Sequence, residues 1–291
     1  MGKLKLENQK EVILFKFDSG ESCTKIARDL GVYLKSVSNL IKTYRPNVPL
    51  RPNKGNTRYF QTIDSYAKAY IVGFIAADGA LVKTKTTTSL TITLKYEDKA
   101  VLEFIKSEIG NSHKLQEIIR PSSFDKTKNI HHIRYVISDK NITNDLNALG
   151  ITSNKSLSMG NIINNIPYPY RDAFIIGYFD GDGSVCTRNQ EYLNQNGYMV
   201  KDYSLYIQIR GTKEFLKGIC EHLNITENHI RQFDSIPQLS FANKKDVSRL
   251  YQCYNNLPFY YKRKHDIFLK RINHPSFDKY KQGQTISSSI N

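Results

Sequence analysis

Two aspartates, Asp78 and Asp182, stand at equivalent places in a repeated segment. Each lies at the end of an apolar stretch and precedes a glycine, in the nonapeptides IVGFIAADG and IIGYFDGDG. Glycine commonly ends a helix in a left-handed conformation, so Gly79 and Gly183 are predicted to end two helices directly after the aspartates. The last turn of a helix leaves backbone carbonyls unpaired. Carboxylate and carbonyl oxygens suit Mg²⁺, so two such helix ends brought together would bind a hard cation.

The chain from about residue 61 to 280 reads as two copies of one unit. Each nonapeptide is followed by an alternating strand pattern, then a helical pattern, then a second strand and another helix. These segments are 89–95 and 204–210, 100–109 and 213–223, and 135–141 and 239–245. The aspartates and the last strand pair share an offset of 104 residues. Two separate segments that keep one offset indicate an internal duplication.

The paired nonapeptides resemble the motif of LAGLIDADG homing endonucleases, and the resemblance covers about residues 65–275. It implies an α+β fold of two pseudo-symmetric αββαββα halves, with the two motif helices packed together at a pseudo-twofold axis. Small residues at positions i and i+4 lie on one helix face and allow two backbones to approach closely. The predicted helix-interface residues are Gly73, Ala77, Gly177 and Gly181. Apolar Ile71, Ile75, Ile175 and Phe179 are expected to anchor the outer faces.

The resemblance also implies the chemistry of the helix ends. Asp78 and Asp182 would be the metal-binding catalytic pair, beside the backbone carbonyls of Ala77 and Gly181 as further metal ligands. The implied cofactor is Mg²⁺ or Mn²⁺, which can activate water and stabilise the leaving 3′-oxygen of a scissile phosphate. Two pseudo-symmetric centres would allow both DNA strands to be cut.

A lysine late in each half points toward the active site in the family that the motifs resemble. The best positional matches are Lys155 and Lys264, which the resemblance makes catalytic residues. Lys262 or Arg263 are alternatives for the second role. A solvated charge that faces a phosphate is the competing interpretation of each lysine.

The sixth motif position differs between the copies, being Ala76 in the first and Asp180 in the second. This position varies in the family and is not the metal ligand. Asp180 is therefore expected to cap a helix or form a salt bridge, and to take no catalytic role.

Residues 8–44 predict three short helices, at 11–17, 22–30 and 34–44, with glycine as a helix stop after the first two. The order of residues 23–37 resembles the helix-turn-helix of resolvase-type and sigma-factor-type DNA readers, whose second helix enters the major groove. The residues expected near DNA are Lys35, Ser36, Ser38, Asn39 and Lys42. A plain three-helix bundle used for packing or protein contact is the alternative.

The segment at 45–60 contains three prolines and several basic residues. Proline blocks helix formation and favours extended backbone, so the segment is predicted to be a linker. A basic arm that lies along a DNA groove, with Arg51, Lys54 and Arg58, is supported equally by the composition.

The two central strand patterns offer a polar face that suits DNA. Along each strand, alternate residues are apolar and the intervening ones are polar or basic. The polar set includes the proposed DNA-contacting residues Thr91, Thr93, Lys95, Tyr206, Gln208 and Arg210. Such groups can bond to base edges and phosphates in a major groove, although a half-exposed antiparallel sheet has the same alternation.

The charge balance favours a polyanionic partner. Lys and Arg total 42 against 27 Asp and Glu, which gives a net charge of +15. Nucleic acid is the usual partner of such a chain. No apolar run approaches the roughly 20 residues that cross a bilayer, and no signal peptide is evident. We therefore expect a cytoplasmic, organellar-matrix or phage-encoded protein that is neither secreted nor bound to a membrane.

Together these features predict a monomeric, Mg²⁺-dependent endonuclease that cuts double-stranded DNA at a long, nearly asymmetric site, as encoded by mobile introns. The alternatives are a catalytically silent transcriptional regulator and a maturase that binds intron RNA on the same surface. The predicted regions are a helix-turn-helix domain at 1–45, a linker at 46–62, halves at 63–165 and 166–280, and a tail at 281–291.

Overall fold

The computed structural model describes residues 8–19, 21–48, 55–121, 125–153, 155–193 and 199–272. The chain divides into two compact units, of which one comprises Met1–Gly55 with Gly110–His113 and the other the remainder. The proposed DNA contacts Arg51 and Lys54 and the predicted tail at 281–291 lie outside the described residues. Within the described ranges, no helix is both long enough and apolar enough to cross a membrane.

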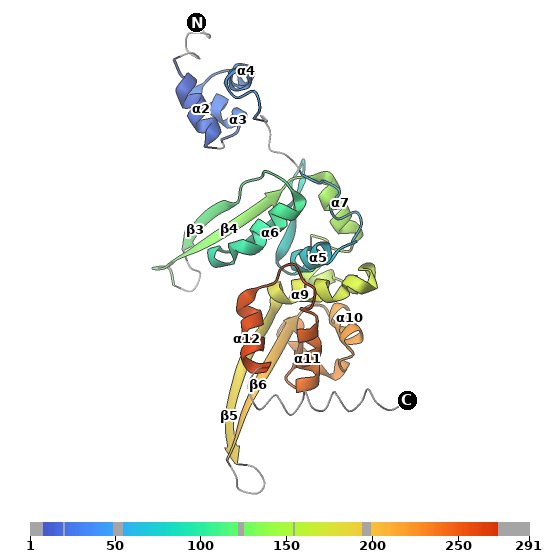
Figure 1. The fold of residues 1–291 in the computed structure, drawn as a ribbon. Coiled ribbons are helices and arrows are strands. Elements are labelled where there is room, and N and C mark those ends of the chain that lie inside the picture. The colour runs from blue at the N-terminus through green and yellow to red at the C-terminus, as the bar shows by residue number, and fades with distance from the viewer. Residues whose placement is uncertain are drawn as a thin grey trace. The chain divides into compact units, whose positions relative to one another are not determined.

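The first unit is built from three helices, at the places that the sequence predicts. They are α2 (Lys10–Asp18), α3 (Cys23–Leu30) and α4 (Leu34–Tyr44) (Figure 1). The Ser22 side chain accepts from the Lys25 N–H and caps the start of α3, and Gly31 ends α3 at φ +62°. The helices pack around a separate small core of Ile13, Leu14, Cys23, Ile26, Ala27, Val37, Leu40 and Ile41.

The second unit contains the αββαββα order twice, as predicted. The first half consists of α5 (Tyr66–Asp78), β1 (Gly79–Lys83), β2 (Thr88–Lys95), α6 (Lys99–Ile109), β3 (Gln116–Pro121), β4 (Asn129–Ile137) and α7 (Lys140–Ala148). The second half consists of α9 (Arg171–Asp182), β5 (Gly183–Leu193), β6 (Met199–Arg210), α10 (Lys213–Leu223), β7 (Ile230–Phe233), β8 (Ile236–Phe241) and α11 (Lys244–Gln252). A further helix follows each half, α8 (Lys155–Ser158) and α12 (Lys262–Ile272). The fold is therefore α+β with two similar halves.

Each half has a four-stranded antiparallel sheet with the same connectivity. The strand orders are β1-β2-β4-β3 and β5-β6-β8-β7. The registers also correspond, since Ile92 pairs with Tyr135 in one sheet and Ile209 pairs with Leu239 in the other. Alternate residues of β2 and β6, including Ile92 and Ile209, are buried against the helices. The polar residues between them consequently line the opposite face of each sheet.

The duplication extends to the helices that follow the last strand of each half, α7 after β4 and α11 after β8. The Asp139 side chain accepts from the N–H groups of Asn141 and Ile142 at the start of α7. The Asn243 side chain accepts from the Asp246 N–H at the start of α11. Asp139 and Asn243 are 104 residues apart, so the two halves use equivalent N-caps.

The second unit begins earlier than the sequence suggested. Tyr59, Phe60 and Ile63 are buried in its core, and the Asn56 N–H donates to the Ile109 carbonyl. The segment at 46–62 is thus folded from Asn56 onward, because its aromatic residues bury against the first half. Arg58 forms an ion pair with Asp145 at 3.0 Å within this unit.

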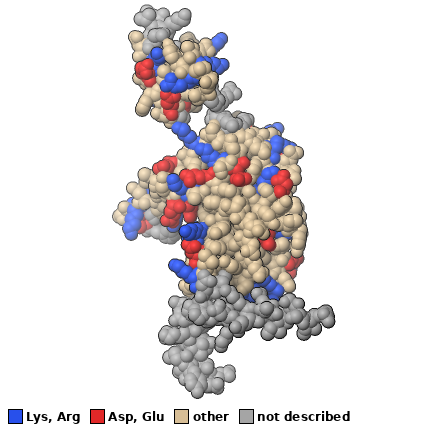
Figure 2. All heavy atoms as spheres, in the orientation of Figure 1, with Lys and Arg blue, Asp and Glu red and all other residues tan. Residues whose placement is uncertain are grey.

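Charged side chains of both signs are interspersed on the face drawn in Figure 2. Lysines and arginines lie next to aspartates and glutamates among a larger number of uncharged residues. The net charge of the chain therefore does not translate into one uniform basic surface on that face.

Candidate active site

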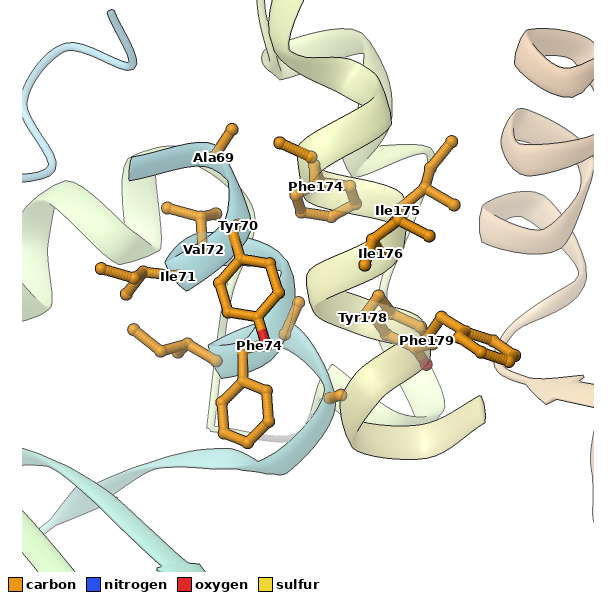
Figure 3. Close-up of a cluster of buried hydrophobic side chains, with 14 of the residues drawn as sticks. Ala69, Tyr70, Ile71, Val72, Phe74, Phe174, Ile175, Ile176, Tyr178 and Phe179 are labelled. Carbon is orange, nitrogen blue, oxygen red and sulfur yellow. The ribbon is translucent and has the colours of Figure 1, made fainter. Parts of the chain in front are cut away.

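The two halves meet through their inner helices, α5 and α9, whose backbones lie in direct contact. A Cβ atom built on Gly73 would lie 2.0 Å from the Phe174 carbonyl oxygen. A Cβ atom built on Gly177 would lie 2.0 Å from the Tyr70 carbonyl oxygen. In Figure 3, Ile71 and Val72 of α5 and Ile175 and Phe179 of α9 point away from the opposite helix. Only glycine permits two helices to approach so closely.

The C-terminal turns of the two helices also touch. A Cβ atom built on Gly181 would lie 2.3 Å from the Ala77 Cβ atom and 3.3 Å from Oδ2 of Asp78. The Asp78 carboxylate therefore lies beside the backbone of the opposite helix. Asp78 is half-buried, whereas Asp182 is the more exposed of the two carboxylates.

The glycines that follow the two aspartates do not adopt the left-handed conformation that the sequence analysis predicted. Gly79 has φ −77° and ψ 152°, and Gly183 has φ −82° and ψ 157°. The prediction was wrong because each helix passes directly into a strand, β1 or β5, which needs an extended residue. Glycine is required for space instead, since built Cβ atoms would lie 2.7 Å from the Ile75 carbonyl oxygen and 2.5 Å from that of Phe179.

A buried lysine donates hydrogen bonds to the last carbonyl oxygens of each inner helix. Lys155 Nζ donates to the carbonyl oxygens of Ala76 at 2.6 Å and Ala77 at 2.5 Å. Lys264 Nζ donates to the carbonyl oxygens of Phe179 and Asp180, each at 2.7 Å, and Gly183 at 2.6 Å. The last carbonyls of a helix carry partial negative charge, which stabilises an ammonium group there. Both lysines are thus fixed in the protein interior by the ends of the same helices that carry the aspartates.

Two carboxylates and two ammonium groups therefore share one small region. Burial, together with the nearby Asp182 carboxylate, raises the pKa of Asp78 to about 6. Burial also raises the pKa of Asp182, while Lys155 and Lys264 oppose that shift. Burial lowers the pKa of Lys264 to about 8 and lowers the pKa of Lys155, and the carboxylates partly offset both changes. The positive charge of the two lysines therefore does not fully offset the effect of burial on the two carboxylates.

The oxygen atoms at this place suit a divalent metal ion. Among the described residues, no group of three or more His, Cys, Asp or Glu side chains is arranged to hold a metal. Two carboxylates with raised pKa values gain from a cation between them, because its charge offsets their desolvation. Carboxylate oxygens are also the donor type that Mg²⁺ or Mn²⁺ prefers.

Asp180 is completely buried and makes contacts that sequence analysis did not find. Its Oδ2 atom accepts from the Tyr70 hydroxyl at 2.8 Å and from the Tyr261 backbone N–H at 2.7 Å. These partners lie 110 and 81 residues away in the sequence. The only local signal was the change from Ala76 to Asp180 at the sixth motif position, which suggested a helix cap or salt bridge.

The alternatives to Lys264 point elsewhere. Lys262 is exposed at the start of α12. The Arg263 guanidinium donates to both carboxylate oxygens of Asp98 at 3.1 Å. The structure brings Lys264 alone among these three to the helix end beside Asp182.

The proposed DNA-contacting side chains lie on accessible parts of both units. Thr93, Lys95 and Arg210 are exposed on the sheets, and Thr91, Tyr206 and Gln208 are partly exposed. The Arg210 Nε atom donates to Gln238 Oε1 at 3.4 Å, so this guanidinium is already oriented. On α4, Lys35, Asn39 and Lys42 are exposed, and Ser36 and Ser38 are partly exposed.

Solved structures similar to this chain are DNA-bound homing endonucleases. The homing endonuclease I-WcaI bound to its DNA recognition sequence is 17% identical, with a TM-score of 0.49 over 77% of this chain and 90% of that one. The LAGLIDADG meganuclease I-CpaMI bound to uncleaved DNA is 13% identical, with a TM-score of 0.46 over 77% and 98%. The I-LtrWI LAGLIDADG homing endonuclease bound to target DNA is 18% identical, with a TM-score of 0.44 over 75% and 91%. No protein-family model and no curated protein matches the sequence. These similarities are distant.

Proposed function

We propose that this protein is a metal-dependent endonuclease that cuts both strands of a specific double-stranded DNA site. The observation that carries the proposal is the pairing of Asp78 and Asp182 at the touching ends of α5 and α9, each helix end closed by a buried lysine. A protein that only binds DNA has no physical need for two apposed carboxylates beside phosphate, because carboxylates repel the backbone that they face.

In this proposal the aspartates and the lysines have different roles. Asp78 and Asp182, with the carbonyls of Ala77 and Gly181, would hold Mg²⁺ or Mn²⁺, which supplies Lewis-acid stabilisation of phosphate and activation of water when bound. Lys155 and Lys264 fix the helix ends, and their positive charge lies where a phosphate would otherwise meet only carboxylates. Because these groups are held before DNA arrives, their reorganisation on binding is small.

DNA contact is proposed for the polar sheet faces, whose amide, hydroxyl and guanidinium groups suit base edges and phosphates. The two faces differ in sequence, with Thr93 and Lys95 in one and Gln208 and Arg210 in the other. A target with two different half-sites therefore fits the molecule as a monomer. The exposed side of α4, with Lys35, Asn39 and Lys42, would add DNA contacts beyond one end of the target site.

The proposal is tested by cleavage of the intronless form of the protein's host locus, with and without Mg²⁺. The wild-type chain is expected to make one discrete Mg²⁺-dependent double-strand cut. The Asp78→Asn/Asp182→Asn double variant should bind the same DNA but leave it uncut. The control Glu103→Gln removes an exposed carboxylate on α6, whose ion pair with Lys99 spans 3.4 Å, and should cut normally.

Each outcome discriminates between the functions that this fold could serve. A full cut by the double variant would contradict the assignment of the two aspartates. Specific binding of the locus without any cut by the wild-type chain would identify a regulator. If the chain neither binds nor cuts this DNA, binding of the corresponding intron RNA would identify a maturase.

A further inference from the structure

We propose that Asp180 is a positioning residue for Lys264, and that cleavage of one DNA strand depends on it while cleavage of the other does not. This inference rests on the proposed function. It concerns the sixth position of the second nonapeptide, whose counterpart in the first is Ala76. Asp180 acts through Tyr261, three residues before Lys264 in the chain, and need not touch DNA or metal.

The segment that precedes Lys264 crosses between the two halves. This segment, residues 259–263, belongs to the second half by sequence but packs on the first. Phe259 stacks on Phe104 of α6 with ring centroids 4.8 Å apart, and it meets the edge of Tyr70 of α5 at 5.8 Å. Arg263 is bound to Asp98 of the first half. Residues 259–263 therefore form a strap that crosses between the halves and places Lys264 at the end of α9.

A buried carboxylate attaches the strap to the inner helices. The Tyr261 N–H donates to Asp180 Oδ2 immediately before α12 begins, and the same oxygen accepts from the Tyr70 hydroxyl. Asp180 lies on α9 and Tyr70 on α5, so this oxygen joins both inner helices and the strap. A buried carboxylate that accepts two hydrogen bonds is a strong and directional attachment.

The pseudo-symmetry of the two halves does not extend to Asp180 and Tyr70. The offset of 104 residues relates Tyr70 to Phe174 and Asp180 to Ala76. The reciprocal place thus lacks both the hydroxyl and the carboxylate. The polar pair is therefore present on one side of the pseudo-twofold axis and absent from the other.

The other lysine lies in a segment with apolar neighbours. Lys155 lies between the buried apolar residues Ile151 and Met159, and the Thr212 hydroxyl of the second half donates to the Met159 carbonyl oxygen. Apolar packing and backbone contacts hold this segment. Loss of Asp180 should therefore disturb one lysine and leave the other in place.

The decisive experiment measures the nicking rate of each strand separately, with a duplex that carries a different end label on each strand. Asp180→Ala removes the acceptor and should slow one strand by at least about tenfold, since small misplacements near a reacting group are costly. The other strand should stay within about twofold of wild type. Asp180→Asn keeps an amide oxygen that can accept from Tyr261, so it should restore most of the lost rate. Equal slowing of both strands, or no slowing of either, would overturn the proposal.

A second measurement does not depend on cleavage. Hydrogen–deuterium exchange of the metal-free protein should become faster in residues 260–266 of Asp180→Ala, while exchange in residues 155–163 should be unchanged. Tyr70→Phe, which keeps Asp180 and the Tyr261 bond, is the matched control and should leave both segments close to wild type. If the wild-type chain cuts no DNA, the proposed function fails, yet this exchange pattern still tests the attachment. Uniformly faster exchange, or none, would refute it.

Discussion

The two lysine-bearing segments reach equivalent places by different means. Lys155 lies on the short helix α8 and bonds to two helix-end carbonyls among the described residues. Lys264 lies on the longer α12 and bonds to three. The first segment is held by apolar packing and backbone contacts, whereas the second adds the Asp180 hydrogen bond and the Arg263–Asp98 ion pair to its aromatic packing. The duplication has thus preserved the position of the ammonium group, not the contacts that hold it.

Pseudo-symmetry of a centre and pseudo-symmetry of the residues that support it are therefore separate properties of this fold. Three carbonyl acceptors use all three donors of the Lys264 ammonium group, so Lys264 can act on a neighbouring anion mainly through its charge. Lys155 has fewer carbonyl acceptors within the described chain. The two centres should therefore respond differently when their supports are changed.

The largest effects are expected from removal of the lysines themselves. Lys155→Met and Lys264→Met should each slow cleavage of one strand, and of opposite strands, by about 10²–10³-fold, as for loss of a preorganised electrostatic group. Strand-resolved nicking at saturating Mg²⁺ measures this. Lys262→Met removes an exposed neighbouring charge and serves as the control. Two lysine variants that slow the same strand would break the assignment of one lysine to each centre.

An intermediate effect, a loss of stability, is expected from substitutions at the glycine contact between α5 and α9, where the halves are most alike. Gly73→Ala and Gly177→Ala each place a Cβ atom 2.0 Å from a backbone carbonyl oxygen. Both should lower the free energy of unfolding by at least roughly 1–3 kcal/mol, because the helices must separate. Urea unfolding followed by circular dichroism gives the two values.

Gly160→Ala is the control, since its added Cβ atom would meet only Glu214 Oε2 at 3.6 Å. Strongly unequal losses for Gly73→Ala and Gly177→Ala would show that the close contact is itself asymmetric.

The smallest effects are expected at the starts of the inner helices, which again differ. Ser65 caps α5 by accepting from the Lys68 N–H, so Ser65→Ala should cost about 1 kcal/mol at any pH. At the start of α9, the hydrogen bond with His222 lowers the pKa of Asp172. A carboxyl group whose pKa is lower in the folded than in the unfolded state stabilises the fold at pH values above its unfolded-state pKa. This stabilisation is lost as the pH falls through the folded-state pKa.

Asp172→Asn should therefore destabilise the protein more at pH 6 than at pH 3, as urea unfolding at the two pH values would measure. A loss of equal size at both pH values would mean that Asp172 acts by packing and not by its charge.

Local patterns predicted much of the fold and part of the candidate site. Strand alternation around Ile92 and Ile209 identified the buried faces, and Ser22 and Gly31 marked helix limits, because these signals depend on neighbouring residues. The small residues Gly73 and Gly177 indicated a close helix contact. The choice of Lys155 and Lys264 came from family resemblance, since nothing local distinguishes a buried lysine from a solvated one.

The missed features depend on contacts between distant segments. Asp180 meets Tyr70 and Tyr261, and no periodicity along the chain signals a carboxylate whose partners lie 110 and 81 residues away. The error at Gly79 arose because glycine was read as a conformational signal, whereas it is there for lack of space. A single sequence does not distinguish these two reasons for glycine.

The backbone contact between α5 and α9 has a consequence for how such a protein changes over generations. The geometry between the two carboxylates is set by main-chain atoms at Gly73 and Gly177, and not by the side chains on the sheets. Substitutions at Thr93 or Gln208 can accumulate without moving the helix ends. Lineages derived from this chain should therefore diverge fastest on the polar sheet faces and most slowly along the helix contact, so that new targets can be acquired while the cutting geometry is inherited intact.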